Sequence, residues 1–192
     1  MILQELYNLD ESSGYSLQGS FTPDLVFSKY WLMKELAEIQ PTISVAYILG
    51  AWYCNLALYF VKFQRPQIGR IINVETNPEF LKTGKKIIDR YGADHVEYML
   101  KDANDVDYRQ LRGNGAVINT SLTDMKGDQW FDNIPPGTLV ALQARDHDPG
   151  RQFTGPDDIQ RIFPLSEVMY SGALNLQDPE TAYSRFMTIG IK

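Results

Sequence analysis

The chain has 192 residues, of which 44% are hydrophobic and 22% are charged, proportions that argue against a disordered or membrane-embedded protein and favour one folded domain. Its formal net charge of −6 repels a phosphate backbone, so we expect no nucleic-acid partner. A single cysteine, Cys54, and two histidines exclude an internal disulfide and a multi-cysteine metal site, so we expect no bound metal.

Residues 1–20 are polar and rich in turn formers, as in "SSGYSLQGS", and we expect either a lid over a pocket or a frayed end. Acidic residues come early and no basic region precedes an apolar core, which is not the pattern of a signal peptide. The longest apolar run, near residues 45–63, contains Gly50, Asn55 and Lys62 and is too short and too polar to span a bilayer. A cytoplasmic protein without a membrane contact is therefore expected.

Two helices and two strands are expected between residues 22 and 75. The first helix follows "TPD", where Thr22 or Asp24 can cap it, and its apolar residues keep a helical spacing until Pro41 stops it near residue 39. A strand, a helix, a loop and a second strand then follow at residues 44–49, 55–63, 64–69 and 70–75.

The rest of the chain alternates in the same way. A helix begins at Pro78, after the N-cap Asn77, and ends before Gly92. Strands are expected at residues 95–100, 115–120 and 138–144, with a helical turn in "QWFDNI". Two β-rich runs, residues 167–176 and 184–191, flank the polar stretch "QDPETAY" in the pattern of a hairpin.

Strands that alternate with helices over about a hundred residues indicate a parallel sheet covered by helices on both faces. We therefore predict an α/β fold for residues 21–192: a Rossmann-like, doubly wound, mostly parallel sheet with an antiparallel C-terminal hairpin. No internal repeat or second domain is visible in the sequence.

Polar or conformationally special residues follow four of the expected strands, where ligands bind in open α/β sheets. Gly50 lets backbone pass close to a ligand or take a tight turn. Glu75 is placed to accept two hydrogen bonds from ribose hydroxyls, and Asp102 to accept one from the exocyclic amine of adenine. Asn119 can hold a zwitterionic amino-acid tail, because its amide is both donor and acceptor.

The order of these segments resembles the class I S-adenosyl-L-methionine (SAM)-dependent methyltransferases. "YILGAWY" stands at the glycine-rich first motif, "INVETNPEF" at the ribose-binding acid, "LKDANDV" at the adenine contact and "AVINTSLTDM" at the fourth motif, and the hairpin looks like the reversed last strand of that fold. The resemblance covers roughly residues 22–192; more narrowly, the chain looks like small phage- and bacterium-associated methyltransferase-like proteins. It implies SAM as cofactor, bound by Gly50, Ala51, Trp52, Tyr53, Glu75, Asp102, Ala103, Asn119 and Thr120.

The sequence departs from that family where G-x-G becomes G-A-W. The aromatic pair offers a different contact, since an aromatic face attracts a sulfonium cation, and the hydroxyl of Tyr53 can also bond the carboxylate tail. A full G-x-G-x-x-G fingerprint is absent, which argues against a dinucleotide.

The candidate catalytic residues are Asn119, Tyr53 and Asp124, with His147 as another possible general base. Each site residue also has a structural interpretation: Gly50 as a plain turn residue, Glu75 as a partner of the next helix dipole, and Asp102 as a cap. Cys54 is expected to be a small buried hydrophobe.

Three functions follow from this pattern. The first is methyl transfer from SAM to a small-molecule acceptor. The second is cleavage or cyclisation of SAM itself on the same fold. The third is a non-catalytic SAM-binding module that recruits a partner, with a possible homodimer formed through the terminal hairpin.

Overall fold

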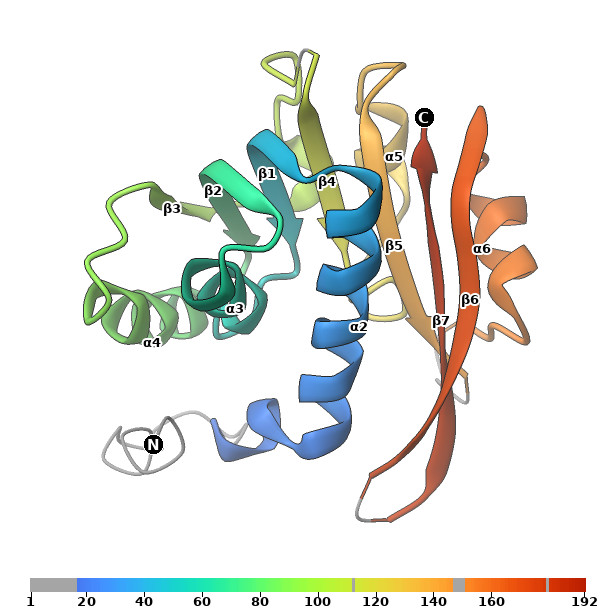
Figure 1. Cartoon of the computed structure of the whole chain (residues 1–192), viewed down its shortest axis with the longest axis horizontal. Helices are drawn as coiled ribbons and strands as arrows, with labels where there is room; N and C mark the ends of the chain where they lie inside the picture. The colour runs from blue at the N-terminus through green and yellow to red at the C-terminus, as the bar shows by residue number, and fades with distance from the viewer. Residues whose placement is uncertain (1–16, 112, 147–150, 179) are drawn as a thin grey trace.

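One seven-stranded sheet forms the centre of the computed structural model, which describes residues 17–111, 113–146, 151–178 and 180–192 (Figure 1). The strand order is β3-β2-β1-β4-β5-β7-β6. The strands are β1 (Thr42–Leu49), β2 (Gln67–Glu75), β3 (Val96–Leu100), β4 (Gly115–Asn119), β5 (Leu139–Arg145), β6 (Glu167–Gln177) and β7 (Ala182–Ile191).

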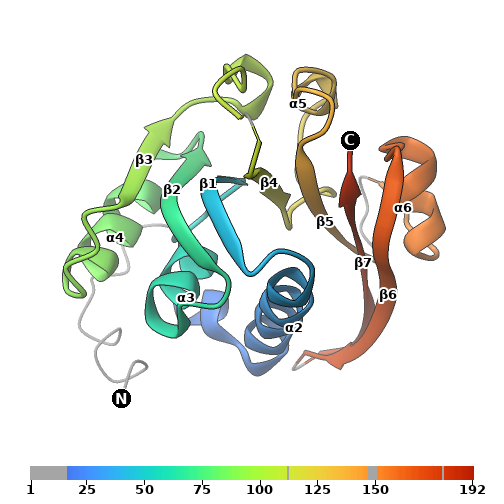
Figure 2. The ribbon, with the colours of Figure 1, turned by 45° about the horizontal axis from the view of Figure 1, so that its top comes forward.

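Helices cover both faces of this sheet (Figure 2). One face carries α2, α3 and α4, and the other carries α5, α6 and the 3-10 turn η2. Their bounds are η1 (Gln18–Phe21), α2 (Pro23–Ile39), α3 (Asn55–Phe63), α4 (Pro78–Asp89), η2 (Ala103–Asp105), α5 (Gln129–Asp132) and α6 (Pro156–Ile162).

The first five strands run parallel, and β7 lies antiparallel between β5 and β6. The predicted α/β fold with its antiparallel C-terminal hairpin is confirmed. The chain places β2 on one side of β1 and β4 on the other, so the strand order reverses there. Ligands of open parallel sheets bind at such a reversal, at the carboxyl edge.

The two faces of the sheet bury separate apolar cores, because successive side chains of a strand point to opposite faces. In β1, Ala46 and Ile48 contribute to the core under α2, α3 and α4. Tyr47 and Leu49 contribute to the core that contains Trp130 of α5. A strand buried on both faces appears in sequence as an uninterrupted apolar run, as β1 does.

Two elements differ from the prediction. Strand β2 begins at Gln67, inside the segment expected to be a loop, because its first residues pair with the start of β1. Helix α6 was not predicted at all. It has seven residues and follows Gly155, and it is held at its start by Asp158, which accepts a hydrogen bond from the backbone N–H of Thr154 at 2.6 Å.

Residues 1–20 were expected to form either a lid or a frayed end, and residues 1–16 of this segment lie outside the described residues. After residue 16, Leu17 and Phe21 are buried in the core beside η1. Among the described residues, no helix combines the length and the apolar character that a membrane span requires.

Candidate functional site

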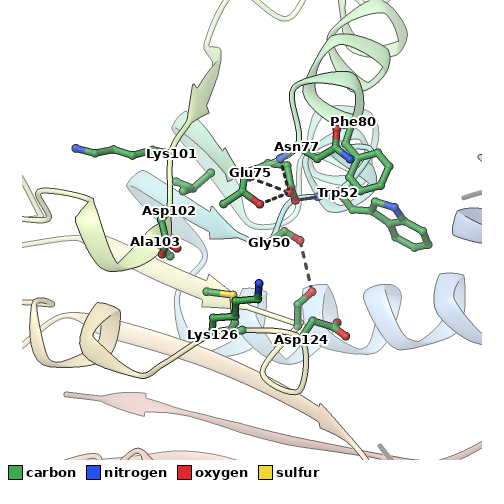
Figure 3. Close-up of a pocket in the computed structure, with 14 residues that line it drawn as sticks. Gly50, Trp52, Glu75, Asn77, Phe80, Lys101, Asp102, Ala103, Asp124 and Lys126 are labelled. Atoms are coloured by element: carbon green, nitrogen blue, oxygen red, sulfur yellow. Dashed lines mark hydrogen bonds between the residues drawn. The ribbon is translucent and has the colours of Figure 1, made fainter. Parts of the chain in front are cut away.

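A recess of about 750 Å³ opens at the carboxyl edge of the sheet (Figure 3). This volume is within the range of small-molecule and cofactor pockets. The residues that line it come from the ends of β1, β2, β3 and β4 and from the segments that follow them: Gly50, Trp52, Val74, Glu75, Thr76, Asn77, Phe80, Lys101, Asp102, Ala103, Ser121, Asp124, Met125 and Lys126.

The turn after β1 has an unusual backbone. Gly50, Trp52 and Cys54 have φ angles of 58°, 50° and 58°, so every second residue is left-handed and two of the three carry a side chain. Left-handed non-glycine residues store conformational strain, which persists only where surrounding contacts hold it. The backbone N–H of Ala51 donates to Val74 at 3.1 Å, and that of Cys54 donates to Ala51 at 2.8 Å.

Two features require a glycine at residue 50: its left-handed backbone and its contact with Ser121. A Cβ atom at this position would lie 3.0 Å from the Cβ of Ser121 and 3.2 Å from its Oγ. The segment after β4 therefore packs directly against the turn after β1. A side chain at residue 50 would push these two walls of the recess apart.

A second close approach supports the turn from behind. A Cβ atom on Gly84, in the middle of α4, would lie 2.7 Å from the Sγ of Cys54 and 2.8 Å from the backbone oxygen of Tyr53. Lys82, Lys85 and Lys86, which flank it in the sequence, are exposed. The buried glycine between them was missed, because nothing local shows which element packs against it.

The carboxylate of Glu75 holds the turn in place (Figure 3). Its Oε2 accepts the backbone N–H of Trp52 at 2.9 Å, and its Oε1 accepts those of Thr76 at 2.8 Å and Asn77 at 3.0 Å. The hydroxyl of Thr76 also donates to Oε1, at 3.3 Å, so Oε1 accepts three hydrogen bonds and Oε2 accepts one. Each carboxylate oxygen offers about two acceptor positions, so Oε2 has about one left. The structural role of Glu75 is therefore compatible with the predicted ligand contact.

Asp102, at the end of β3, presents an acceptor to the recess. Its Oδ1 accepts the backbone N–H and the side-chain amide of Asn104, both at 2.9 Å. Its Oδ2 accepts no hydrogen bond from the described residues. Asp102 is thus a cap for η2, as its structural interpretation expected, and still has one oxygen available for a ligand donor.

Asn104, which was not predicted as a site residue, joins two walls of the recess. Its side-chain amide donates to the backbone oxygen of Lys126 at 2.8 Å, and its Oδ1 accepts the backbone N–H of Trp130 at 2.9 Å. The segment after β3 is thereby fixed to the segment after β4. An asparagine in a polar loop gives no sequence signal for such a contact.

The two aromatic residues of the turn have different environments. Trp52 lines the recess. Tyr53 is 3% exposed, belongs to the apolar core and packs against Phe80 with ring centroids 4.8 Å apart. The sequence favoured Tyr53 over Trp52 as the residue that contacts a cation, whereas in the structure Trp52 is the one that faces the recess.

Three further predicted site residues lie beneath the recess and do not line it. Ala51 and Thr120 are 7% and 8% exposed, and Asn119 is fully buried. The Oδ1 of Asn119 accepts the backbone N–H of Ser121 at 2.9 Å, while its Nδ2 is buried without a hydrogen-bond partner. Burying an amide N–H group without a hydrogen-bond partner is costly. Among the described residues with such a buried donor, Asn119 is the nearest in sequence to the recess.

Five of the nine predicted cofactor-binding residues therefore line the recess, namely Gly50, Trp52, Glu75, Asp102 and Ala103. Asp124, a predicted catalytic residue, also lines it and is exposed. His147 lies outside the described residues.

Cys54 has no nucleophilic character in this site. Burial, with a smaller contribution from the charge of Glu75, raises the pKa of its thiol far above the usual range. A thiol in this state stays protonated at neutral pH, and the thiolate is the reactive form. The expectation of a small buried hydrophobe is confirmed.

No protein-family model and no curated protein matches the sequence. Solved structures nevertheless share its fold. The N-methyltransferase NodS from Bradyrhizobium japonicum WM9, in complex with S-adenosyl-L-homocysteine (SAH), superimposes with a TM-score of 0.71 at 12% identity over 98% of both chains. Magnesium protoporphyrin IX methyltransferase (ChlM) from Synechocystis PCC 6803, with bound SAM, gives 0.67 at 8% identity over 98% of this chain and 89% of that one.

An rRNA methylase from Streptococcus thermophilus is also similar, with a TM-score of 0.58 at 14% identity over 85% of this chain and 96% of that one. The acceptors named for these three proteins differ in kind. What they share with this chain is the fold of the class I SAM-dependent methyltransferases.

Proposed function

We propose that this protein is a SAM-dependent methyltransferase that acts on a small-molecule acceptor. The observation that carries the proposal is the recess at the carboxyl edge, where Glu75 and Asp102 face one cavity of nucleoside size behind the left-handed turn at Gly50. The fold neighbours that contain SAM or SAH support the same cofactor.

The residues present fit the parts of this cofactor. Asp102 has one free carboxylate oxygen for the exocyclic amine of adenine, and Val74 and Met125 supply apolar contacts in the same recess. Glu75 has about one acceptor position left, which suits one ribose hydroxyl rather than the two expected from sequence. Trp52 offers an aromatic face to the sulfonium, an attraction worth about 0.5–2 kcal/mol.

The chemistry supplied by SAM is a methyl group activated by the sulfonium. The chain's own task is to align an acceptor atom with that methyl group and to remove a proton where the acceptor carries one. Asp124 lines the recess and is the carboxylate that we assign to proton removal. Asn119, with its unpartnered Nδ2, is the donor that we assign to the amino-acid tail. Because Asn119 is fully buried and does not line the recess, this contact requires the segment after β4 to move.

A small-molecule acceptor is favoured by the charge of the chain. A net charge of −6 opposes binding of a polyanionic nucleic acid. One of the fold neighbours is an rRNA methylase, so a nucleic-acid acceptor is the alternative to a small molecule.

Calorimetric titration of the purified chain with SAH, SAM and NAD⁺ tests the cofactor. We expect SAH and SAM to bind and NAD⁺ not to bind, and an absence of SAH binding would refute the proposal. Incubation with SAM alone separates the two kinds of chemistry. If products form without an acceptor, the protein cleaves or cyclises SAM and the proposal of methyl transfer is wrong.

A further inference from the structure

Two cationic side chains from distant parts of the chain meet at the carboxyl end of β4. The Nζ of Lys29, in α2, donates to the Oγ1 of Thr120 at 2.5 Å. A guanidinium nitrogen of Arg185, near the start of β7, donates to the backbone oxygen of the same Thr120 at 2.5 Å. We call Lys29 and Arg185 the cation pair.

Arg185 is buried and Lys29 is half-buried, and neither forms an ion pair with another described residue. Arg185 is 7% exposed, and its Nε is buried without a hydrogen-bond partner. Lys29 is half-buried as a residue, and its Nζ is held by the Oγ1 of Thr120. Among the described residues, no carboxylate lies within the 4.0 Å of an ion pair with either side chain.

The acids nearby act only at longer range. Asp124 and Asp24 contribute to the field at Arg185, and Asp124 to the field at Lys29. Asp24 is itself buried: its Oδ2 accepts the hydroxyl of Tyr183 at 2.6 Å, and its Oδ1 has no hydrogen-bond partner among the described residues. Burial, together with repulsion from Arg185, therefore lowers the pKa of Lys29 well below its usual range.

Two buried like charges without an anion in contact are unfavourable, because Asp124 and Asp24 offset desolvation and mutual repulsion only in part. An anion bound between them would satisfy the Nε of Arg185 and reverse the repulsion. Planar guanidinium groups match carboxylates especially well. The pair thus has the composition of a carboxylate site.

The position of the pair relates it to the recess. Thr120 precedes Ser121, which lines the recess, and Asp124 lines the recess while acting on both cations. Lys29, Arg185 and Thr120 do not line it themselves. The pair therefore adjoins the Gly50 side of the recess from the direction of α2 and β7.

We propose that Lys29 and Arg185 bind a carboxylate of the methyl acceptor, which makes the acceptor an acidic small molecule. This inference rests on the proposed function. The carboxylate is assigned to the acceptor because SAM carries a net positive charge, and two further buried cations beside it require an additional anion.

The test uses the full chain saturated with SAH and titrated with acetate and benzoate, against chloride at equal ionic strength. We expect both carboxylates to raise the melting temperature of the wild type more than chloride does, as ligands of the native state. This difference should disappear in Lys29→Met and in Arg185→Gln. It should persist in Lys34→Met, an exposed lysine of the same helix, and in Arg109→Gln, whose side chain is 86% exposed.

An equal response of wild type and Lys29→Met, or no response of the wild type, would overturn the inference. Lys29→Met decides the matter if Arg185→Gln does not fold. Calorimetry with SAH separates the source of the carboxylate: we expect less than about a twofold change in either variant, and a loss of about tenfold or more would assign the pair to the cofactor's own tail. If the wild type does not bind SAH, the proposed function fails, and the carboxylate titration without SAH still tests the pair.

Discussion

The carboxylate of Glu75, at the end of β2, accepts the backbone N–H of Trp52 at 2.9 Å and so holds the turn after β1 to the neighbouring strand. One side chain thereby fixes the wall of the recess and presents an acceptor to it. The residue that we propose as the ribose contact thus also supports the fold.

Glu75→Gln replaces one of the two acceptor oxygens by a donor that faces a backbone N–H. We expect the free energy of unfolding to fall by about 1.5–3 kcal/mol, the value of a hydrogen bond to a charged group. SAH affinity should fall at the same time. The matched control is Glu97→Gln on the surface, where the pair with Arg70 is about half exposed and its loss should cost less than about 1 kcal/mol. Urea unfolding and calorimetry measure both effects, and equal stabilities of the two variants would contradict the role of Glu75.

Gly50→Ala places a Cβ in a left-handed residue and against Ser121. The left-handed conformation alone costs an L-residue about 1–2 kcal/mol. Gly92→Ala is the control, because Gly92 has a φ of 61° and a Cβ there would meet nothing within 4 Å. We expect Gly50→Ala to lose more stability than Gly92→Ala and also to weaken SAH binding. Equal losses in urea unfolding would show that the contact with Ser121 is unimportant.

Gly84→Ala tests the packing of α4 against the turn. In an exposed helix this change stabilises by about 1 kcal/mol, because alanine is the better helix former. Here the new Cβ would overlap Cys54 and the backbone of Tyr53, so we expect a loss of about 1–3 kcal/mol. Cys54→Ala in the same chain should restore only part of it, since the backbone oxygen remains. A more stable Gly84→Ala protein would refute the close approach.

Asp102→Asn tests the adenine contact. An asparagine can still accept the bonds from Asn104, so we expect stability to change by less than about 0.5 kcal/mol. The free oxygen becomes a donor that opposes the exocyclic amine, and SAH affinity should fall by about tenfold. Replacing that amine by an oxo group in the ligand should weaken binding to the wild type but not to the variant, as a double-mutant cycle measures. Parallel losses in both proteins would remove Asp102 from the contact.

Lys29→Met should remove a pH dependence of stability. The pKa of Lys29 is lower in the folded state than the unfolded value of about 10.4, so the unfolded chain binds more protons between the two values. Wild-type stability relative to Lys29→Met should therefore rise with pH across that window, and the burial penalty is fully present below it. Lys34→Met is the control that should stay flat in this range, because the hydrogen bond to Glu35 raises the pKa of Lys34 and moves its window above the unfolded value. Urea unfolding between neutral pH and about pH 10 measures both differences, and a flat difference for Lys29→Met would contradict burial of its charge.

The sequence determined the order and type of most elements. Apolar runs such as residues 44–49 identify parallel strands, because these are buried on both faces, and Asn77 with Pro78 marks the start of α4 at the observed residue. The sequence does not predict helix α6, because a seven-residue helix has too few turns to show a periodic apolar pattern. Strand ends then located Gly50, Glu75 and Asp102 at one edge of the sheet.

Local patterns cannot report which distant residues touch, and the tertiary structure decided those contacts. The register of β1 against β2 brings Glu75 to the amide of Trp52, and the packing of α4 makes Gly84 necessary. Lys29 and Arg185 look like ordinary surface cations in the sequence. They become a buried pair only because α2 and β7 meet at the end of β4, and the cost of burying charge depends on that environment rather than on the residues themselves.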